Sequence, residues 1–360
     1  MSSTVLTPLN KNQAKTVRDS NIELLRIFAI LGVITLHYNG SFALSLVNPN
    51  SINQYILIFL EGLFICAVNL FVLISGYFSV NSQKRKAIKA IELVVQVICM
   101  NMACYVMLSV FSSSFTIRGL LQSAIPNNYY AILYITVYLI SPYINILLNK
   151  LTDKQLITFA TLLLILFAVW PTILDVFQTF GYIYGGLYTT NSYGSQYGYS
   201  IINFILMYIV GATLRREIYK PKTYVLFIAL AVCLGVIFFW QFVQPQIARS
   251  YCNPFVIALA VIIFLLFKRI NLKNKIINNL SKATFTCFLV HNIFLGKIGI
   301  AKFVNVSPVL LVLHILVSSV GIFLVCWVIW TVYDLVTRPI FKFIDSKLIC
   351  LDKVLSPDNT

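Results

Sequence analysis

Long apolar segments alternate with short polar ones along most of the chain. Ten of these segments are long enough to cross a bilayer, which takes about 20 residues of helix. They lie at 22–46, 54–80, 88–111, 129–148, 155–174, 199–214, 222–243, 253–267, 280–300 and 307–333. The pattern predicts an all-α fold, a polytopic helical membrane protein with about ten transmembrane helices.

Lys and Arg are unevenly divided between the two sides of this predicted bundle. When the connecting segments are assigned to alternate sides, 22 of the 27 Lys and Arg fall on one side. Four fall on the other side, and Arg26 lies inside the first apolar segment. Cytoplasmic loops carry such an excess. We therefore expect residues 1–21 and 334–360 to be cytoplasmic tails of a transmembrane domain at 22–333, so that both termini lie inside the cell.

The composition agrees with this class of protein. Hydrophobic residues make up 59% of the chain and charged residues 11%, with a mean hydropathy of +0.86. Soluble domains carry about 25% charged residues, so an ordinary soluble enzyme, a disordered protein and a nucleic-acid-binding domain are excluded. Most of the eight cysteines lie inside apolar segments and none forms a CxxC pair, so no metal site is expected.

The first apolar segment contains three ionisable residues, Glu23, Arg26 and His37. Such groups are costly in hydrocarbon and mark functional sites in membrane helices. Eleven residues make about three helical turns, so Arg26 and His37 share one stripe, about 16 Å apart along the axis. Glu23 precedes Arg26 by three residues, a spacing that allows pairing. With the N-terminus inside, Arg26 lies near the cytoplasmic mouth and His37 within the membrane.

Two interpretations of these residues are open. An arginine at the inner mouth suits a phosphorylated cytosolic donor, and a deep histidine suits proton abstraction from a hydroxyl or transient acyl carriage. Alternatively, Glu23 and Arg26 form a structural pair, and His37 is a packing residue that is hydrogen-bonded to a neighbouring helix.

The spacing of Glu23, Arg26 and His37 resembles the signature of the acyltransferase type 3 family. These are bacterial integral-membrane O-acyltransferases of cell-surface glycans. Four later segments resemble further family motifs in the same order: VNLFVLISGYF at 68–78, YLISPYINILLNKL at 138–151, MYIVGATLRR at 207–216 and TFTCFLVHN at 284–292. The last segment contains His291 and has Phe288 where the family usually has Tyr. The resemblance covers most of the chain.

The resemblance implies a stand-alone O-acetyltransferase, a multi-pass protein of the bacterial plasma membrane. Acyl-CoA, in particular acetyl-CoA, would be a cytosolic co-substrate, with no tightly bound cofactor and no metal. The acceptor would be a sugar hydroxyl of a surface glycan, an exopolysaccharide or a lipid-linked sugar. Arg26, aided by Glu23, would orient the donor, and His37 would be the acid/base or the acyl carrier. His291 would line the active cavity, and lipids would be the other partners.

The basic loop KRKAIK at 84–89 is a second candidate donor site. The matching stretch of the family carries an Arg-x-x-Arg pair that holds the phosphates of acyl-CoA. Lys86 and Lys89 have that spacing here, with Arg85 beside them. Lysine binds phosphate as a point charge, without the bidentate fork of arginine. The alternative is ordinary cytoplasmic-side charge that contacts anionic lipid headgroups.

Acceptor-binding residues are expected in two places. In the second segment Asn69, Ser75 and Tyr77 belong to a strip of small and polar residues that faces either the cavity or a closely packed helix. In the outward loop at 175–198 the glycine-spaced residues Tyr182, Tyr184 and Tyr188 are candidates for a flat aromatic surface that contacts a sugar. Tyrosines also gather at membrane interfaces without any catalytic reason.

Two further ionisable residues have no role in the family motifs that we matched. Glu61, in the second segment, is a candidate histidine partner or a neighbour of an outer water-filled cavity. His314, in the last segment, is expected to be a packing histidine. Neither assignment follows from spacing alone.

Non-enzymatic functions are also compatible with buried charge in the first helix. In a flippase or a small-solute transporter, Arg26 and His37 would belong to a translocation gate. In a structural partner of a polysaccharide synthase, both residues would be replaceable. Binding of CoA from the cytoplasm separates the acyltransferase from these alternatives.

The charge distribution makes a topological prediction. A reporter that is active only in the cytoplasm should be active when fused at either terminus, because the excess of Lys and Arg lies on that side. A fusion within 112–128, on the opposite side, is the control and should be inactive. An outward-facing C-terminus would contradict the count of ten spans.

Overall fold

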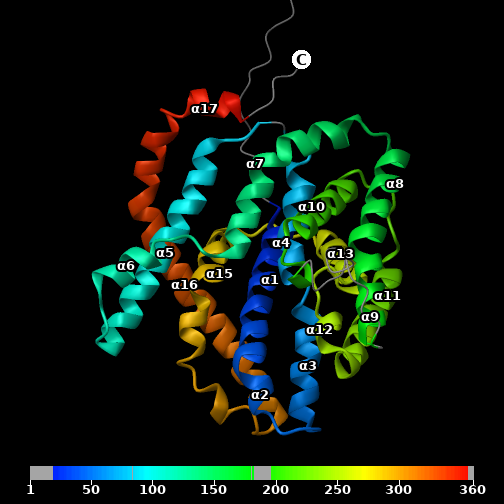
Figure 1. Ribbon diagram of the computed structural model, residues 1–360, viewed down its shortest axis with the longest axis vertical. Helices are drawn as coiled ribbons and strands as arrows, with labels where there is room; N and C mark the ends of the chain where they lie inside the picture. The colour runs from blue at the N-terminus through cyan, green and yellow to red at the C-terminus, as the bar shows by residue number, and fades with distance from the viewer. Residues whose placement is uncertain (1–18, 83, 180, 182–195, 356–360) are drawn as a thin grey trace, which may run out of the picture.

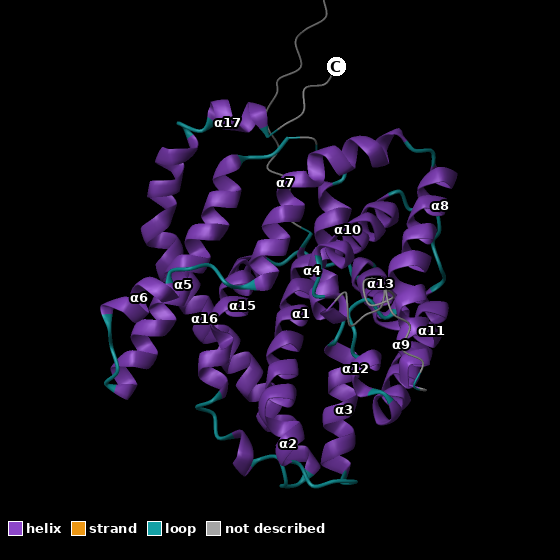
Figure 2. Cartoon of the chain, viewed as in Figure 1, coloured by secondary structure: helices purple, strands orange, loops and turns teal. Residues whose placement is uncertain are grey.

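The computed structural model describes residues 19–82, 84–179, 181 and 196–355, and the regular structure within these ranges is helical (Figures 1 and 2). Its α-helices are α1 (Ser20–Tyr38), α2 (Leu44–Leu46), α3 (Ile52–Phe64), α4 (Ala67–Ser79), α5 (Ala87–Ser112), α6 (Ile117–Ser123), α7 (Tyr129–Lys150), α8 (Asp153–Leu164), α9 (Trp170–Thr179), α10 (Ile201–Arg215), α11 (Thr223–Val243), α12 (Pro245–Ala248), α13 (Pro254–Lys268), α14 (Lys275–Leu280), α15 (Thr284–Leu295), α16 (Pro308–Asp345) and α17 (Ile349–Val354). Short π-helices, η1 (Asn39–Ala43) and η2 (Ile165–Val169), and 3₁₀-helices, η4 (Gln196–Gly198), η5 (Ser281–Ala283) and η6 (Ile300–Lys302), connect several of them.

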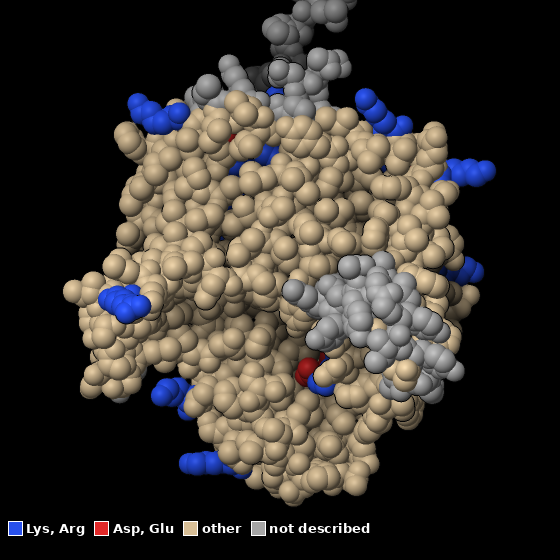
Figure 3. All heavy atoms as spheres, in the orientation of Figure 1, with Lys and Arg blue, Asp and Glu red and all other residues tan. Residues whose placement is uncertain are grey.

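Seven helical stretches among the described residues are long and apolar enough to span a membrane. They are Ser20–Leu46, Ile52–Ser79, Ala87–Val110, Tyr129–Lys150, Asp153–Gln178, Thr223–Val243 and Pro308–Asp345. The apolar helices α10 and α13 are shorter, and each of the ten predicted segments contains a helix. Figure 3 shows a face that is uncharged over most of its area, as contact with lipid requires. The prediction of an all-α polytopic membrane protein is confirmed.

Two helices differ in length from their predicted segments. α15 has 12 residues, about 18 Å of rise, which is less than the roughly 30 Å hydrocarbon core. It ends before Gly296, and Gly299 follows with a φ of 67°, a conformation that glycine adopts without strain. α16 runs beyond the predicted end at residue 333 to Asp345, because the ion pair between Asp334 and Arg338 has helical spacing and supports a further turn.

The centre of the bundle is α1, which packs against α3, α4, α13, α14, α15 and α16 (Figure 1). Leu25, Ile30 and Ile34 on this helix are fully buried. The π-helix η1 follows directly after Tyr38, and the side-chain amide of Asn39 donates to the carbonyl oxygen of Leu57 at 3.0 Å. This contact ties the end of α1 to α3 and fixes the turn that carries His37.

Close packing of α4 against α10 explains the small residues of the second predicted segment. A Cβ atom at Gly76 would lie 2.0 Å from the carbonyl oxygen of Tyr208, and one at Gly211 would lie 2.1 Å from that of Leu73. Small residues let membrane helices approach this closely. Gly76 therefore packs directly against α10.

Candidate active site

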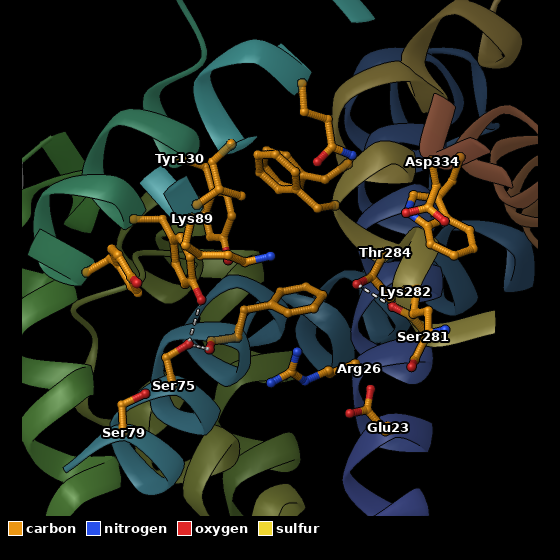
Figure 4. A pocket seen from close by; sticks show the side chains of 18 of the residues that line it. Glu23, Arg26, Ser75, Ser79, Lys89, Tyr130, Ser281, Lys282, Thr284 and Asp334 are labelled. Atoms are coloured by element: carbon orange, nitrogen blue, oxygen red, sulfur yellow. Dashed lines mark hydrogen bonds between the residues drawn. The ribbon is translucent and has the colours of Figure 1, made fainter. Parts of the chain in front are cut away.

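One cavity, of about 460 Å³, opens beside the first half of α1 (Figure 4). We call it the Arg26 cavity. Its walls come from α1, α4, α5, α7, η5, α15 and α16. Figure 4 shows Arg26 pointing from α1 toward Ser75 on α4, with Glu23 on the same side of α1 and Lys282 beside Asp334.

Positive charge predominates in the Arg26 cavity. Its described lining includes four Lys and Arg and two Asp and Glu: Arg26, Lys89, Lys282 and Arg338, with Glu23 and Asp334. Arg338 is paired with Asp334. The Nε atom of Arg26 is buried and has no hydrogen-bond partner among the described residues. A buried donor of this kind has a large cost unless a ligand satisfies it, so the cavity suits an anionic group.

The Arg26 cavity continues into a second hollow of about 430 Å³ between α5 and α16. Lys89, Gln96, Trp330 and Arg338 line both spaces. The lining of this hollow contains Lys342 and also the acidic residues Glu92 and Asp345, and Lys89 is ion-paired with Glu92 at 3.1 Å. The excess of positive charge therefore belongs to the Arg26 cavity.

A separate cavity, of about 320 Å³, lies beside the end of α1. We call it the His37 cavity. His37 and His291 line it together with Glu61 on α3. Three tyrosines from different parts of the chain, Tyr129, Tyr199 and Tyr251, complete an aromatic wall.

The two histidines of this cavity form a hydrogen-bonded pair. His37 Nδ1 lies 2.9 Å from the carbonyl oxygen of Val33, and His291 Nδ1 lies 2.8 Å from that of Cys287. A carbonyl oxygen only accepts, so each Nδ1 is the nitrogen that carries a proton. His291 Nε2, 3.3 Å from His37 Nδ1, accepts a second bond from the same N–H. In the neutral form of His37 this arrangement places the lone pair on Nε2, where a substrate can meet it.

Phe288 lies at the boundary of the two cavities, because its side chain lines both. Its ring centroid is 4.5 Å from that of Tyr130, in the Arg26 cavity, and 6.4 Å from that of His291. A ligand that extends from the Arg26 cavity to His37 must pass this ring. The aromatic side chain therefore separates two polar spaces within the membrane-spanning region.

Several predicted site residues meet at these cavities. Glu23, Arg26, Lys89 and Ser75 line the Arg26 cavity. His37 and His291 line the other.

The structure places Arg85 and Lys86 outside the lining of both cavities. Arg85 is buried and donates from Nε and Nη2 to the hydroxyl oxygen of Ser141 at 2.9 and 2.8 Å. Lys86 is bound to Asp345 at 2.8 Å, a hydrogen bond that raises the pKa of its ammonium group. Both side chains are thus engaged at the start of α5, and their predicted contact with the donor stays a prediction.

Asn69 and Tyr77 also lie outside the cavities. The amide of Asn69 donates to the carbonyl oxygen of Tyr251 at 2.8 Å and accepts from Asn203 at 3.0 Å, so it supports the aromatic wall from behind. Tyr77 lies under two cations, with Arg215 at 4.9 Å and Lys268 at 5.0 Å from its ring centroid. Cation–π contacts of this kind stabilise packing between helix ends.

The remaining predicted residues fall into two groups. Tyr182, Tyr184 and Tyr188 lie outside the described residues. His314 packs as expected: its ring stacks on Phe303 at 3.9 Å between centroids, and its Nδ1 lies 2.8 Å from the hydroxyl of Tyr38.

The lining also contains residues that the sequence did not single out, among them two cations, Lys282 and Arg338, and three tyrosines, Tyr129, Tyr199 and Tyr251. The two cations had been counted only as part of the cytoplasmic-side excess of charge. The three tyrosines stand near segment ends, where aromatic residues are common. Their position at the start of predicted helices was the one available signal.

The fold and the cavities define a polytopic membrane protein with two polar chambers along one helix. The model of a family described as an acyltransferase domain matches residues 19–331, and the chain therefore belongs to the acyltransferase 3 family. This match confirms the resemblance of the motifs and makes the protein a membrane acyltransferase, with an acyl donor and an acceptor. Comparison with curated proteins and with solved structures gives no match.

Proposed function

We propose that this acyltransferase moves an acetyl group from cytosolic acetyl-CoA to a sugar hydroxyl of a bacterial cell-surface glycan or its lipid-linked precursor. It would act in the plasma membrane with both termini in the cytoplasm. The proposal combines the family membership with the chemistry of the two cavities.

The observation that carries the proposal is the position of two residues on α1. Arg26 lines one cavity and His37 lines the other, and Phe288 belongs to both linings. The two residues are about 16 Å apart along the helix axis. An elongated donor that is anchored by its charged end at Arg26 would present its reactive end near His37.

CoA fits the chemistry of the Arg26 cavity because it carries several phosphates at one end. Arg26 would bind a phosphate through its guanidinium group, whose Nε lacks a partner among the described residues. Lys89, Lys282 and Arg338 would hold the remaining negative charge. In this proposal these residues, rather than Arg85 and Lys86, hold the phosphates. Glu23, on the same face of α1, would orient Arg26.

His37 would act as a general base through Nε2. It would take the proton of the acceptor hydroxyl as the hydroxyl oxygen attacks the thioester carbonyl carbon. The carbon–sulfur bond then breaks, and the CoA thiolate leaves and receives the proton from His37. His291 is a positioning residue, since its Nε2 accepts from His37 Nδ1 and keeps that imidazole in the required tautomer. An acyl-histidine route would use the same nitrogen as a nucleophile.

The donor site can be tested by charge reversal. Lys89→Glu and Lys282→Glu should each weaken acetyl-CoA binding about tenfold, because each removes a charge-assisted contact to phosphate. Binding to the protein in lipid nanodiscs, measured by calorimetry, should also weaken with added salt.

Lys86→Glu is the matched control for the donor site. It makes the same charge change three residues from Lys89, at a side chain that is 65% exposed and lies outside the cavity lining. Its affinity for acetyl-CoA should stay within about twofold of the unmodified protein. If the affinity for acetyl-CoA changes neither with salt nor in Lys89→Glu and Lys282→Glu, the donor binds elsewhere.

The catalytic role of His37 can be tested by truncation. His37→Ala should insert into the membrane and bind acetyl-CoA normally, since His37 lies outside the Arg26 cavity. Its rate of acyl transfer should fall by about 10²–10⁴-fold, the usual contribution of a general base. Transfer to surface glycan is measured by NMR of the O-acetyl groups, in membranes with matched protein levels.

His314→Ala is the control for this experiment. It removes another membrane histidine, one that contacts Tyr38 and Phe303 rather than either cavity. Most of the activity should remain. Normal acylation by His37→Ala would show that His37 is not the base and would overturn this mechanism.

A further inference from the structure

The two cavities differ in the sign of their charge. The Arg26 cavity has an excess of Lys and Arg, whereas Glu61 is the one Asp, Glu, Lys or Arg in the described lining of the His37 cavity. A polyanion is attracted to the first cavity, whereas the described lining of the second contains no Lys or Arg and its one carboxylate, Glu61, is already paired with Arg249. The Arg26 cavity therefore favours an anionic ligand, and the His37 cavity favours an uncharged one.

The carboxylate of Glu61 is held in place but not saturated. Glu61 is 6% exposed, and its Oε1 lies 3.6 Å from a guanidinium nitrogen of Arg249. Its Oε2 is buried and has no hydrogen-bond partner among the described residues. The terminal torsion of a glutamate is soft, so a donor in the cavity can be met by turning the carboxylate. In that position Oε2 can accept a hydrogen bond from a hydroxyl or an amide of a ligand.

The aromatic wall of this cavity has the form that an uncharged sugar ring needs. The ring centroid of Tyr199 is 4.9 Å from that of Tyr129 and 4.6 Å from that of Tyr251. The hydroxyl of Tyr199 donates to that of Tyr251 at 3.4 Å. Tyrosine combines an apolar ring face with a polar edge. The C–H face of a pyranose can pack on such rings while its hydroxyls reach Glu61 and His37.

We infer that the His37 cavity binds the acceptor as a neutral pyranose, and that Glu61 is its specificity-determining residue. The inference rests on the proposed function, because it concerns the acceptor of that reaction. Glu61 accepts a hydrogen bond from a second hydroxyl of the sugar while His37 takes the proton of the reacting one. Arg249 holds the carboxylate in position through its contact with Oε1. An acidic sugar is disfavoured, because its carboxylate would be buried beside Glu61 in a lining whose described residues include no Lys or Arg, and Arg249 is already paired with Glu61.

The test uses the protein in lipid nanodiscs with acetyl-CoA and simple glycosides as acceptor probes. The neutral probes are the methyl pyranosides of glucose, galactose and mannose, and the anionic probe is methyl glucuronide. Release of the CoA thiol gives the rate, and mass spectrometry of the glycoside confirms acetylation. We expect kcat/KM for at least one neutral glycoside to exceed that for the glucuronide by about tenfold or more.

Glu61→Gln should change acceptor recognition alone. The KM for the neutral glycoside should rise about tenfold, because a neutral amide replaces the carboxylate and the hydrogen bond from the sugar hydroxyl loses its charged acceptor. The KM for acetyl-CoA and kcat should stay within about threefold, and discrimination against the glucuronide should shrink. The matched control is Asp153→Asn, which breaks an ion pair with Arg216 (2.7 Å apart) away from both cavity linings. It should leave all three constants unchanged.

The outcomes separate this inference from the function on which it rests. Acetylation with an unaltered acceptor KM in Glu61→Gln, or a preference of the unmodified protein for the glucuronide, overturns the inference and leaves the acyltransferase proposal intact. If Glu61→Gln fails to fold, the preference of the unmodified protein between the neutral glycosides and the glucuronide still tests the inference. Failure to acetylate any glycoside, while His37→Ala behaves like the unmodified protein, overturns the proposed function as well.

Discussion

The site depends on one constraint, which is that a single helix carries an arginine and a histidine at a fixed separation inside a bundle. Because Arg26 and His37 are about three turns apart on α1, neither can approach the other without breaking the helix. The surrounding helices bury the apolar faces of α1 and leave two cavities at these two residues. Ionisable groups persist in such surroundings only where ligands, water or partners satisfy them. In our account an anionic ligand satisfies the buried Nε of Arg26.

The boundary between the cavities is as important as the cavities themselves. Phe288 and Tyr130 place aromatic rings between a cationic space and a space that contains one carboxylate, Glu61. An apolar barrier hinders the passage of ions and water, whereas a slender uncharged chain can lie against it. In our account the thioester end of the donor crosses this barrier, and its phosphates stay behind.

The sequence was enough to predict the helices and the α1 stripe, because both follow from local periodicity. It could not show which cations of the basic loops face the cavity. Arg85 lies one position from Lys86 and is buried against α7, whereas Lys89, one turn into α5, lines the Arg26 cavity. Lys282 joins Lys89 only through tertiary packing of segments that are far apart in the chain. Such long-range contacts leave no periodic signal.

The most direct test of the account is the side from which each substrate acts. The protein is reconstituted in vesicles with one orientation, with acetyl-CoA on the side of the termini and a membrane-impermeant oligosaccharide on the other side. The account predicts acetylated oligosaccharide inside intact vesicles, with no leak of CoA and no product from His37→Ala. Product that forms only when both substrates share one side would contradict the claim that donor and acceptor meet at His37 from opposite cavities.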